Sequence, residues 1–256
     1  MEKLVTESSE IAYAVSGNPQ GPRVVLIHGL FLNSDCWENQ LPALEKEYCV
    51  LRFDLYGHGR STRPRKKFTV RSYVKELARL LDHLKWTEVL AMIGHSLGGM
   101  VALVYALDNP LRVKKLVIAS SYCFVSNEAV TDVMSRVSGN PLDKFAIGIA
   151  KRGLVPYDEA TAKKIAAMVV DHMSRDDALF ATAASAGFNI CQELRGLRIP
   201  TLLLVGEKDI TTPVWASEML HEWLPDSTIK TLKGAGHLLI YDHPAEFNSL
   251  VLEFLR

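Results

Sequence analysis

The stretch Val89-Leu90-Ala91-Met92-Ile93-Gly94-His95-Ser96-Leu97-Gly98-Gly99 decides the fold that this sequence predicts. Its apolar first half is typical of a buried strand, and the following Met100-Val101-Ala102-Leu103 is typical of a helix. Between them lies Gly-x-Ser-x-Gly, a tight turn whose glycines are needed because the backbone packs too closely for side chains. Such a turn holds its serine in a strained conformation with the hydroxyl exposed. The motif is common by chance, but between a strand and a helix it predicts that Ser96 is a nucleophile.

Five more strand-like runs stop at polar or glycine-rich residues: Arg23–His28, Tyr48–Asp54, Val113–Ala119, Thr201–Val205 and Thr228–Leu232. Most are apolar throughout, which is typical of parallel strands buried on both faces. Segments of helical length alternate with them: 37–46, 70–83, 98–109, 214–223 and 245–255. This rhythm predicts a mostly parallel, doubly wound α/β sheet. The polar segment Lys3–Val15, with a turn at Ser8-Ser9, is expected to form an antiparallel edge hairpin.

One interval, between Ser121 and Arg198, contains no strand-like run. Apolar residues recur there at helical spacing in four segments: Asn127–Val137, Leu142–Lys151, Asp158–Met173 and Asp176–Phe188. Asp158 and Asp176 are the expected N-caps. Helices inserted between two strands of one sheet are typical of a lid. We therefore assign residues 1–121 and 191–256 to an α/β core and residues 122–190 to a helical cap.

The composition argues against several classes of partner. The 29 basic and 29 acidic residues balance, so neither nucleic acid nor stable membrane association is expected. The basic run Arg60–Arg71 is interpreted as a solvated loop. Four cysteines, Cys36, Cys49, Cys123 and Cys191, are too scattered for a zinc site or a disulfide-dense scaffold. With no signal-peptide pattern or membrane-length apolar run, we expect a soluble protein in a reducing, cytoplasmic setting.

A serine hydroxyl needs a base, and the base needs an orienting carboxylate. Asp209 follows the strand-like run 201–205 and His237 follows the run 228–232, so each stands at the carboxyl end of a strand, where parallel sheets bind ligands. The order Ser96, Asp209, His237 is the one expected for this type of elbow. Glu207 competes for the acid role, but it lies nearer the strand end, so we prefer Asp209.

The remaining histidines are assigned no catalytic role. His28 and His58 are expected to hold loops by hydrogen bonding, and the side chain of His95 is expected to point away from Ser96. No pair of histidines stands four residues apart on one helix, so no metal is expected. Two backbone N–H groups should form an oxyanion hole. We assign them to Leu97 and to Leu30, with Phe31 as the second choice for the latter.

With these motifs in hand, the sequence resembles the α/β-hydrolase superfamily and its small members with a helical cap. The resemblance rests on His28-Gly29, the segments 54–61 and 94–99, Gly206–Asp209 and Gly236-His237. A fainter likeness, to pimeloyl-carrier-protein methyl ester esterases, rests on length and on His243–Phe247. The resemblance implies acyl transfer through Ser96, Asp209 and His237, and it implies no cofactor.

The cap residues favour an apolar, small-molecule ester as substrate. Phe31, Phe124, Phe145 and Leu238 are the predicted substrate contacts. Arg136, Arg152 and Arg175 are available, but the sequence assigns none of them to a substrate carboxylate. We therefore rank a carboxylesterase above a thioester, lactone or carbon–carbon bond hydrolase. A non-catalytic ligand receptor on the same fold is the remaining alternative.

Overall fold

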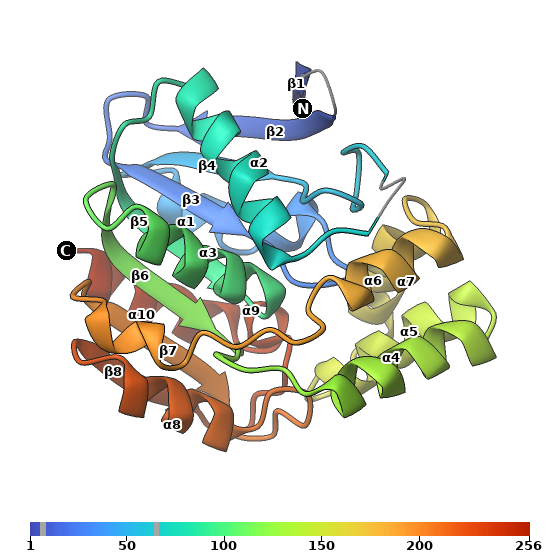
Figure 1. Cartoon of the computed structure of the whole chain (residues 1–256). Helices are drawn as coiled ribbons and strands as arrows, with labels where there is room; N and C mark the ends of the chain where they lie inside the picture. Colours follow the sequence, from blue (N-terminus) through green and yellow to red (C-terminus); the bar gives the residue numbers. More distant parts are fainter. Residues whose placement is uncertain (6–8, 64–66) are drawn as a thin grey trace.

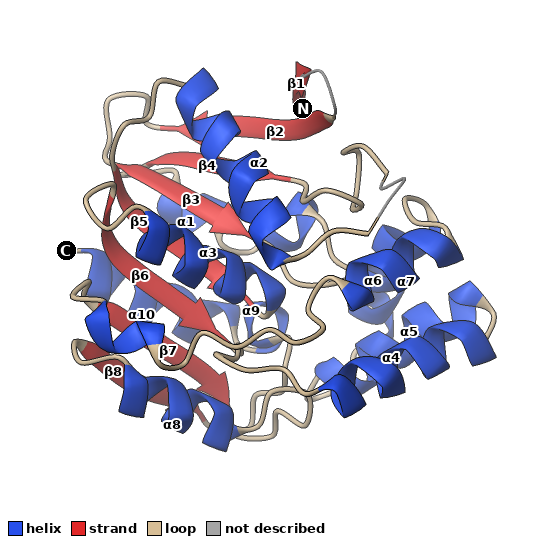
Figure 2. Ribbon diagram, viewed as in Figure 1, coloured by secondary structure: helices blue, strands red, loops and turns tan. Residues whose placement is uncertain are grey.

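The computed structural model describes residues 1–5, 9–63 and 67–256 of the chain. Its centre is an eight-stranded sheet in the order β1-β2-β4-β3-β5-β6-β7-β8 (Figures 1 and 2). The parallel part contains β3 (Arg23–Ile27), β4 (Cys49–Phe53), β5 (Val89–His95), β6 (Val113–Ala119), β7 (Thr201–Gly206) and β8 (Ser227–Leu232). The predicted α/β class and its parallel sheet are therefore confirmed.

The edge hairpin is also present. Strand β1 (Glu2–Val5) pairs antiparallel with β2 (Glu10–Gly17), and β2 pairs antiparallel with β4. Ser8, half of the expected turn, lies outside the described residues, as do Arg65 and Lys66 of the basic run.

Helices cover both faces of the sheet, which explains why its strands are apolar throughout. Alternate residues of one strand pack into different cores: Val25 and Ile27 into the first, Val24 and Leu26 into the second. The first core includes residues of α2 (Val70–His83), α3 (Leu97–Asp108) and α8 (Val214–Trp223). The second includes residues of α1 (Leu41–Leu44) and α10 (Pro244–Leu255), and α9 (Leu239–Asp242) packs beside α10.

The helix expected over residues 37–46 does not form as one element. A short 3₁₀ turn (Ser34–Trp37) and the four-residue α1 take its place. Pro42 explains the difference, because proline lacks the N–H that the interior of a helix requires. It is tolerated only near the beginning of α1.

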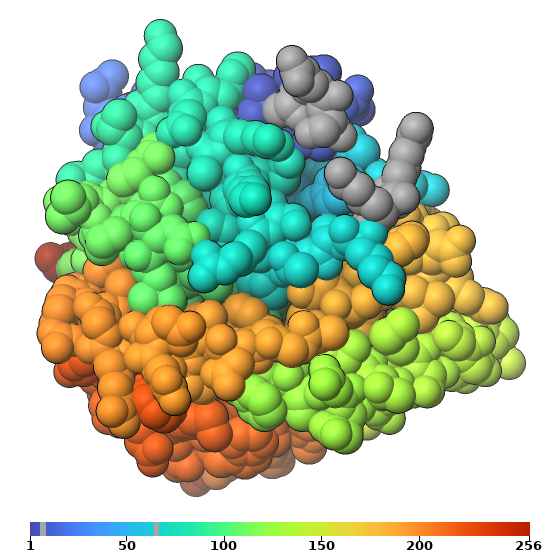
Figure 3. Space-filling model, in the orientation of Figure 1, coloured from blue at the N-terminus to red at the C-terminus, as the bar shows by residue number. Residues whose placement is uncertain are grey.

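The segment between β6 and β7, residues 122–190, is called the insertion below. It contains α4 (Asn127–Gly139), α5 (Leu142–Gly153), α6 (Glu159–Val170) and α7 (Arg175–Ala183). Figure 1 shows these helices beside the carboxyl ends of the parallel strands, and Figure 3 shows them, yellow-green to gold, covering one end of the molecule. Phe31 of the core packs with Phe145, Val169 and other insertion residues in a third apolar cluster. The insertion therefore lies over the end of the sheet where ligands of such folds bind.

One of the two predicted helix caps of the insertion is confirmed. The Asp158 side chain accepts a hydrogen bond from the Thr161 N–H at 2.7 Å and caps α6. The prediction for Asp176 is wrong, because Ser174 caps α7 and forms a capping box with Asp177. A hydroxyl two residues earlier reaches the free N–H groups that Asp176, already inside the first turn, cannot reach.

A disulfide joins Cys123 to Cys191 where the chain enters and leaves the insertion. Beside it, the Val125 N–H donates to Phe188 and the Ile190 N–H donates to Cys123, both at 2.9 Å. The spacing of 68 residues gave no sign of this bond. Disulfides are rare in reducing compartments, so the bond weighs against the reducing, cytoplasmic setting, which stays a prediction. In the described part of the chain, no helix has both the length and the apolar character needed to cross a membrane.

Candidate active site

Ser96 lies at the sharp turn between β5 and α3, with backbone angles of φ 52° and ψ −115°. Residues other than glycine adopt a positive φ at a cost of about 1–3 kcal/mol, so the residues around Ser96 must enforce this conformation. A Cβ on Gly94 would collide with the backbone of Gly98, and one on Gly98 would collide with the carbonyl of Ile27. The two glycines are therefore required by close backbone contacts, as the motif predicted.

Asp209 and His237 come together from the ends of β7 and β8. The His237 Nδ1 lies 3.0 Å from the Asp209 Oδ2, and both residues are buried. Because Asp209 is a carboxylate, Nδ1 carries the proton and donates it to this bond. The opposite nitrogen, Nε2, is then the one left to act as a base toward the pocket that Ser96 and His237 both line.

Thr212 completes the hydrogen bonding of Asp209. Its N–H and that of Thr211 donate to Oδ1 at 2.8 Å, and its hydroxyl donates to Oδ2 at 2.6 Å. Burial alone would raise the pKa of Asp209, but His237 and the Thr212 bonds outweigh it and hold that pKa well below its usual range. Asp209 is therefore ionised throughout the neutral range and fixes the orientation of His237.

The competing acid, Glu207, is occupied elsewhere. It is exposed, and its Oε2 accepts a hydrogen bond from the Gly234 N–H at 2.9 Å. The geometry favours Asp209 as the partner of His237.

The two N–H groups proposed for an oxyanion hole face no competing acceptor. Leu97 is the first residue of α3, so its N–H has no partner within the helix. Leu30 lines the pocket beside Phe31, whose φ of 66° turns the loop after β3. Among the described residues, neither N–H donates to another group. Both are therefore free to stabilise negative charge on an oxygen bound beside Ser96.

His95 has a structural contact that the sequence did not indicate, because its ring lies against the loop of His237. Its Nε2 lies 2.9 Å from the His237 carbonyl, and the two ring centroids are 4.9 Å apart. Burial and the neighbouring His237 lower the pKa of His95 to about 3, so the ring is neutral and Nε2 donates to that carbonyl. His95 thus supports the position of the His237 backbone.

The structural roles expected for His28 and His58 are confirmed. His28 Nε2 accepts from the Leu55 N–H at 2.9 Å, and its Nδ1 donates to the Gly29 carbonyl at 2.8 Å. His58 Nδ1 donates to the Tyr56 carbonyl at 3.1 Å. Both histidines are fully buried and tie together the loops that follow β3 and β4.

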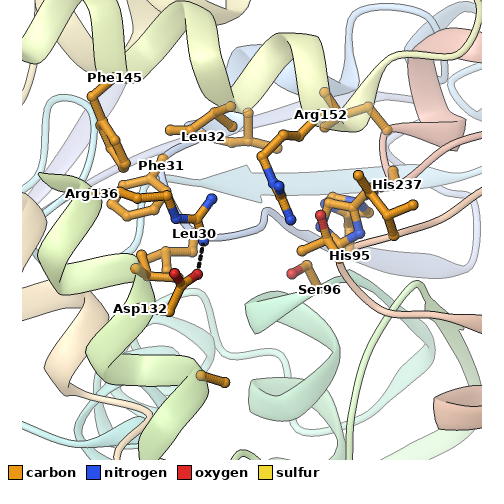
Figure 4. Close-up of a pocket in the computed structure, with 16 residues that line it drawn as sticks. Leu30, Phe31, Leu32, His95, Ser96, Asp132, Arg136, Phe145, Arg152 and His237 are labelled. Atoms are coloured by element: carbon orange, nitrogen blue, oxygen red, sulfur yellow. Dashed lines mark hydrogen bonds and ion pairs between the residues drawn. The ribbon is translucent and has the colours of Figure 1, made fainter. Parts of the chain in front are cut away.

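A pocket of about 300 Å³ opens above Ser96 between the sheet and the insertion. Figure 4 shows Phe31, Phe145 and Leu32 on one side of it and Ser96, His95 and His237 on the other. Of the four predicted contacts, Phe31, Phe145 and Leu238 line this pocket. Such a volume suits a small molecule.

The fourth prediction, Phe124, is not supported. Its side chain is 40% exposed, and its backbone bridges to Asn189 at the base of the insertion instead of lining the pocket. Phe124 directly follows Cys123 of the disulfide. The two ends of the insertion pair with each other at this point and hold Phe124 away from the pocket.

Several lining residues were not identified from the sequence. Arg136 and Arg152 both line the pocket, whereas Arg175 donates to the Asn140 carbonyl outside it. Ile210 and Thr211 line it because they adjoin Asp209. Thr212, which lies outside the lining and supports Asp209, had a local signal, because an aspartate in a turn commonly accepts hydrogen bonds from groups a few residues later. Within the described ranges, no group of His, Cys, Asp and Glu is arranged to hold a metal ion.

With this geometry described, comparison with known proteins becomes informative. The model of the alpha/beta hydrolase fold family matches residues 22–153, which is more than half of the chain. The chain belongs to the α/β-hydrolase family. It is accordingly a hydrolase of that fold.

Its relatives cover nearly the whole chain at modest identity. A Caulobacter protein named as a carbamate hydrolase, RutD, is 29% identical over 95% of this chain and 94% of its own. A pimeloyl-[acyl-carrier protein] methyl ester esterase of Aeromonas hydrophila is 28% identical over 92% of this chain and 96% of its own. The crystal structure of a hydrolase from Pseudomonas aeruginosa superposes with a TM-score of 0.92 at 26% identity, covering 99% and 97% of the two chains.

Proposed function

We propose that this chain is a serine hydrolase that cleaves a carboxylic ester of a small molecule through an acyl-enzyme. The observation that supports it best is the buried His237–Asp209 hydrogen bond beside a pocket that also contains Ser96 on a strained turn. The name of the Aeromonas relative, a methyl ester esterase, supports an ester as substrate, and that of the Caulobacter relative makes a carbamate the second candidate.

The reaction has two steps. Nε2 of His237 takes the proton of the Ser96 hydroxyl while Oγ attacks the ester carbonyl, and the new oxyanion accepts hydrogen bonds from the N–H groups of Leu30 and Leu97. The carbon–oxygen bond to the alcohol then breaks, and the alcohol leaves with the proton from Nε2. In the second step, His237 takes a proton from water as the water attacks the acyl-enzyme, and the acid is released when Ser96 regains that proton. Asp209 stays ionised throughout and stabilises the imidazolium.

The insertion acts as a lid in this proposal. It supplies Phe145 and Ile149 to the pocket, and the Gly153 carbonyl at the end of α5 accepts a hydrogen bond from the Leu238 N–H at 3.0 Å. The lid therefore contacts the residue directly after the base and sets which substrates reach it.

Labelling with a fluorophosphonate and burst kinetics with p-nitrophenyl acetate test the proposal. The wild-type protein should label at Ser96 and release one equivalent of p-nitrophenol in the burst. Ser96→Ala should abolish labelling and lower kcat by about a million-fold, with an unchanged melting temperature because only a hydroxyl is lost. Residual turnover above about a thousandth of wild type would mean that the nucleophile is misassigned.

A substrate panel separates the ester reading from its alternatives. We expect kcat/KM to be highest for small esters and lower for a matched thioester, lactone, carbamate and vinylogous diketone. If the wild-type protein binds ligand in the pocket but never labels, the chain is a receptor and the proposal is wrong.

A further inference from the structure

Two arginines line a pocket whose other walls are largely apolar. Arg136 comes from α4 and Arg152 from α5, and Asp132 is the one carboxylate among the described lining residues. Burial keeps His95 neutral, so that ring adds no charge. The guanidinium groups thus leave this pocket with an excess of positive charge beside the candidate nucleophile.

The two arginines differ in their partners. Arg136 pairs with Asp132 at 2.8 Å, and its Nε is buried without a hydrogen-bond partner in the described structure. The side chain of Arg152 forms no ion pair or hydrogen bond with any described residue. Figure 4 shows its side chain descending from the insertion toward Ser96 and His237. The charge of Arg136 is partly neutralised, whereas that of Arg152 is available to a ligand.

The position of Arg152 is fixed by backbone contacts of its neighbour. The Leu238 N–H donates to the Gly153 carbonyl, and a Cβ on Gly153 would collide with the Leu238 side chain. This close approach holds the last turn of α5 against the loop that carries His237. A cation at the carboxyl end of a helix is favourable by itself, but the adjacent Lys151 provides that interaction while lying outside the pocket lining. Helix stabilisation therefore does not explain why Arg152 lies in the pocket.

We propose that the preferred substrate carries a carboxylate that Arg152 binds on the insertion side of the pocket, while the ester carbonyl lies at Ser96. Guanidinium binds carboxylate through two parallel N–H donors, and Arg136, which lines the same pocket, adds a positive charge that Asp132 partly neutralises. The substrate class is the monoester of a small dicarboxylic acid. This inference rests on the proposed ester hydrolysis for its turnover test, but the anion site is also measurable by binding alone.

A matched pair of esters tests the proposal: monomethyl glutarate and methyl pentanoate, which differ only by a carboxylate in place of a terminal methyl. Hydrogen bonds to charged groups change rates by about 10- to 100-fold, so the wild-type kcat/KM should favour monomethyl glutarate by that factor. Arg152→Gln should remove this preference, because it should lower kcat/KM for monomethyl glutarate by about 10- to 100-fold more than kcat/KM for methyl pentanoate. Lys151→Gln, the same change of charge one residue away, should keep the preference.

Two further measurements separate this proposal from the function it rests on. Calorimetry measures the affinity of the Ser96→Ala variant for monomethyl glutarate. This affinity should fall by the same factor in the double variant that also carries Arg152→Gln. In the wild type, raising NaCl from about 0.05 M to about 1 M should lower kcat/KM for monomethyl glutarate more than for methyl pentanoate, because salt screens the attraction between the carboxylate and Arg152. Melting temperatures should agree among the variants, since Arg152 is exposed.

The contrary outcomes are distinct. If the wild type shows no preference, or if Lys151→Gln removes it equally, no carboxylate is bound by Arg152 and the anion site is wrong. If Arg152→Gln slows both esters alike, the residue acts on the reaction and not on a substrate carboxylate, which also overturns the proposal. If Ser96→Ala binds monomethyl glutarate through Arg152 but no ester is ever turned over, the anion site stands and the ester hydrolase fails.

Discussion

The carboxyl edge of the sheet and the insertion contribute to one pocket in different ways. At the sheet edge, Ser96 directly follows β5, and Asp209 and His237 lie in the short loops after β7 and β8, so the chain's local path largely sets their positions. In the insertion, Arg136, Phe145 and Arg152 reach the pocket only because helices α4 and α5 are docked over it. The edge carries the candidate chemistry, and the insertion carries the candidate selectivity.

The difference teaches where local sequence is sufficient. A strand that ends in a parallel sheet directs the following residues toward the ligand-binding edge, whatever the distance to its partner in the chain. A helix offers several faces, and which face meets a pocket depends on how it is docked against the rest of the molecule. Variants at the sheet edge should therefore lose the reaction itself, whereas variants in the insertion should lose stability or selectivity.

The largest expected effect in the edge region after loss of Ser96 itself comes from Asp209→Asn. An amide cannot hold His237 in its tautomer, so kcat should fall by about 10⁴-fold with little change in KM. Glu207→Gln, two residues earlier in the same loop, is the matched control and should stay within about twofold. Steady-state kinetics on one chromogenic ester measure both. If the two variants exchanged effects, the acid would be Glu207.

The insertion should depend on its disulfide for stability and not for chemistry. By loop entropy, removing a cross-link that spans 68 residues with Cys123→Ala and Cys191→Ala costs up to about 4 kcal/mol. Urea unfolding of the double variant measures the loss, and fluorophosphonate labelling below the transition should be preserved. A reducing agent should lower the stability of the wild type to that of the variant and leave the variant unchanged. An unchanged midpoint would show that the bond does not stabilise the fold.

Selectivity should shift on changing one lining residue of the insertion. Phe145→Leu opens space beside Phe31, with which Phe145 makes an edge-to-face contact at 5.1 Å. We expect the ratio of kcat/KM for a branched over a linear acyl ester to rise by about tenfold, since pocket contacts of this kind are worth about 1–3 kcal/mol. Phe124→Leu, outside the pocket, should leave the ratio unchanged. Equal shifts in both variants would place the cause outside the pocket.

The smallest effect concerns Asp242, which accepts the N–H of Gly236, the residue before His237, at 2.8 Å. Burial raises its pKa to about 6, against the opposing bonds from the Gly236 and Val155 N–H groups. The folded protein therefore binds this proton more tightly than the unfolded chain, whose aspartate titrates near pH 3.9. Its contribution to stability is fully present below about pH 4 and is lost as pH rises through 6.

Asp242→Asn tests that sign, because its amide oxygen can still accept the Gly236 N–H. The melting temperature of the variant should exceed that of the wild type by a few degrees above pH 6 and match it below pH 4. Asp226 is exposed, so the control substitution Asp226→Asn should not change the melting temperature in a pH-dependent way. A variant that is less stable at every pH would contradict a buried, partly protonated carboxyl.

Much of the fold could be predicted because the relevant signals are local. The bounds of α2 and α8 agree with the expected segments 70–83 and 214–223, where apolar periodicity is interrupted by no proline. The helix expected at 37–46 does not form as one element because of Pro42, which is itself a local signal. The Cys123–Cys191 bond could not be predicted, since no pattern in the sequence shows that the two ends of the insertion lie side by side.

In the candidate site, too, local features could be predicted from the sequence and long-range contacts could not. The sequence alone determined the strained turn at Ser96 and the strand ends that precede Asp209 and His237, because glycine spacing and strand periodicity act over a few residues. Only the tertiary structure decided that His95 supports the backbone of His237, that Phe124 stays outside the pocket, and that Arg152 lines it. These positions depend on contacts between residues far apart in the chain, such as the packing of the end of α5 against the loop of His237.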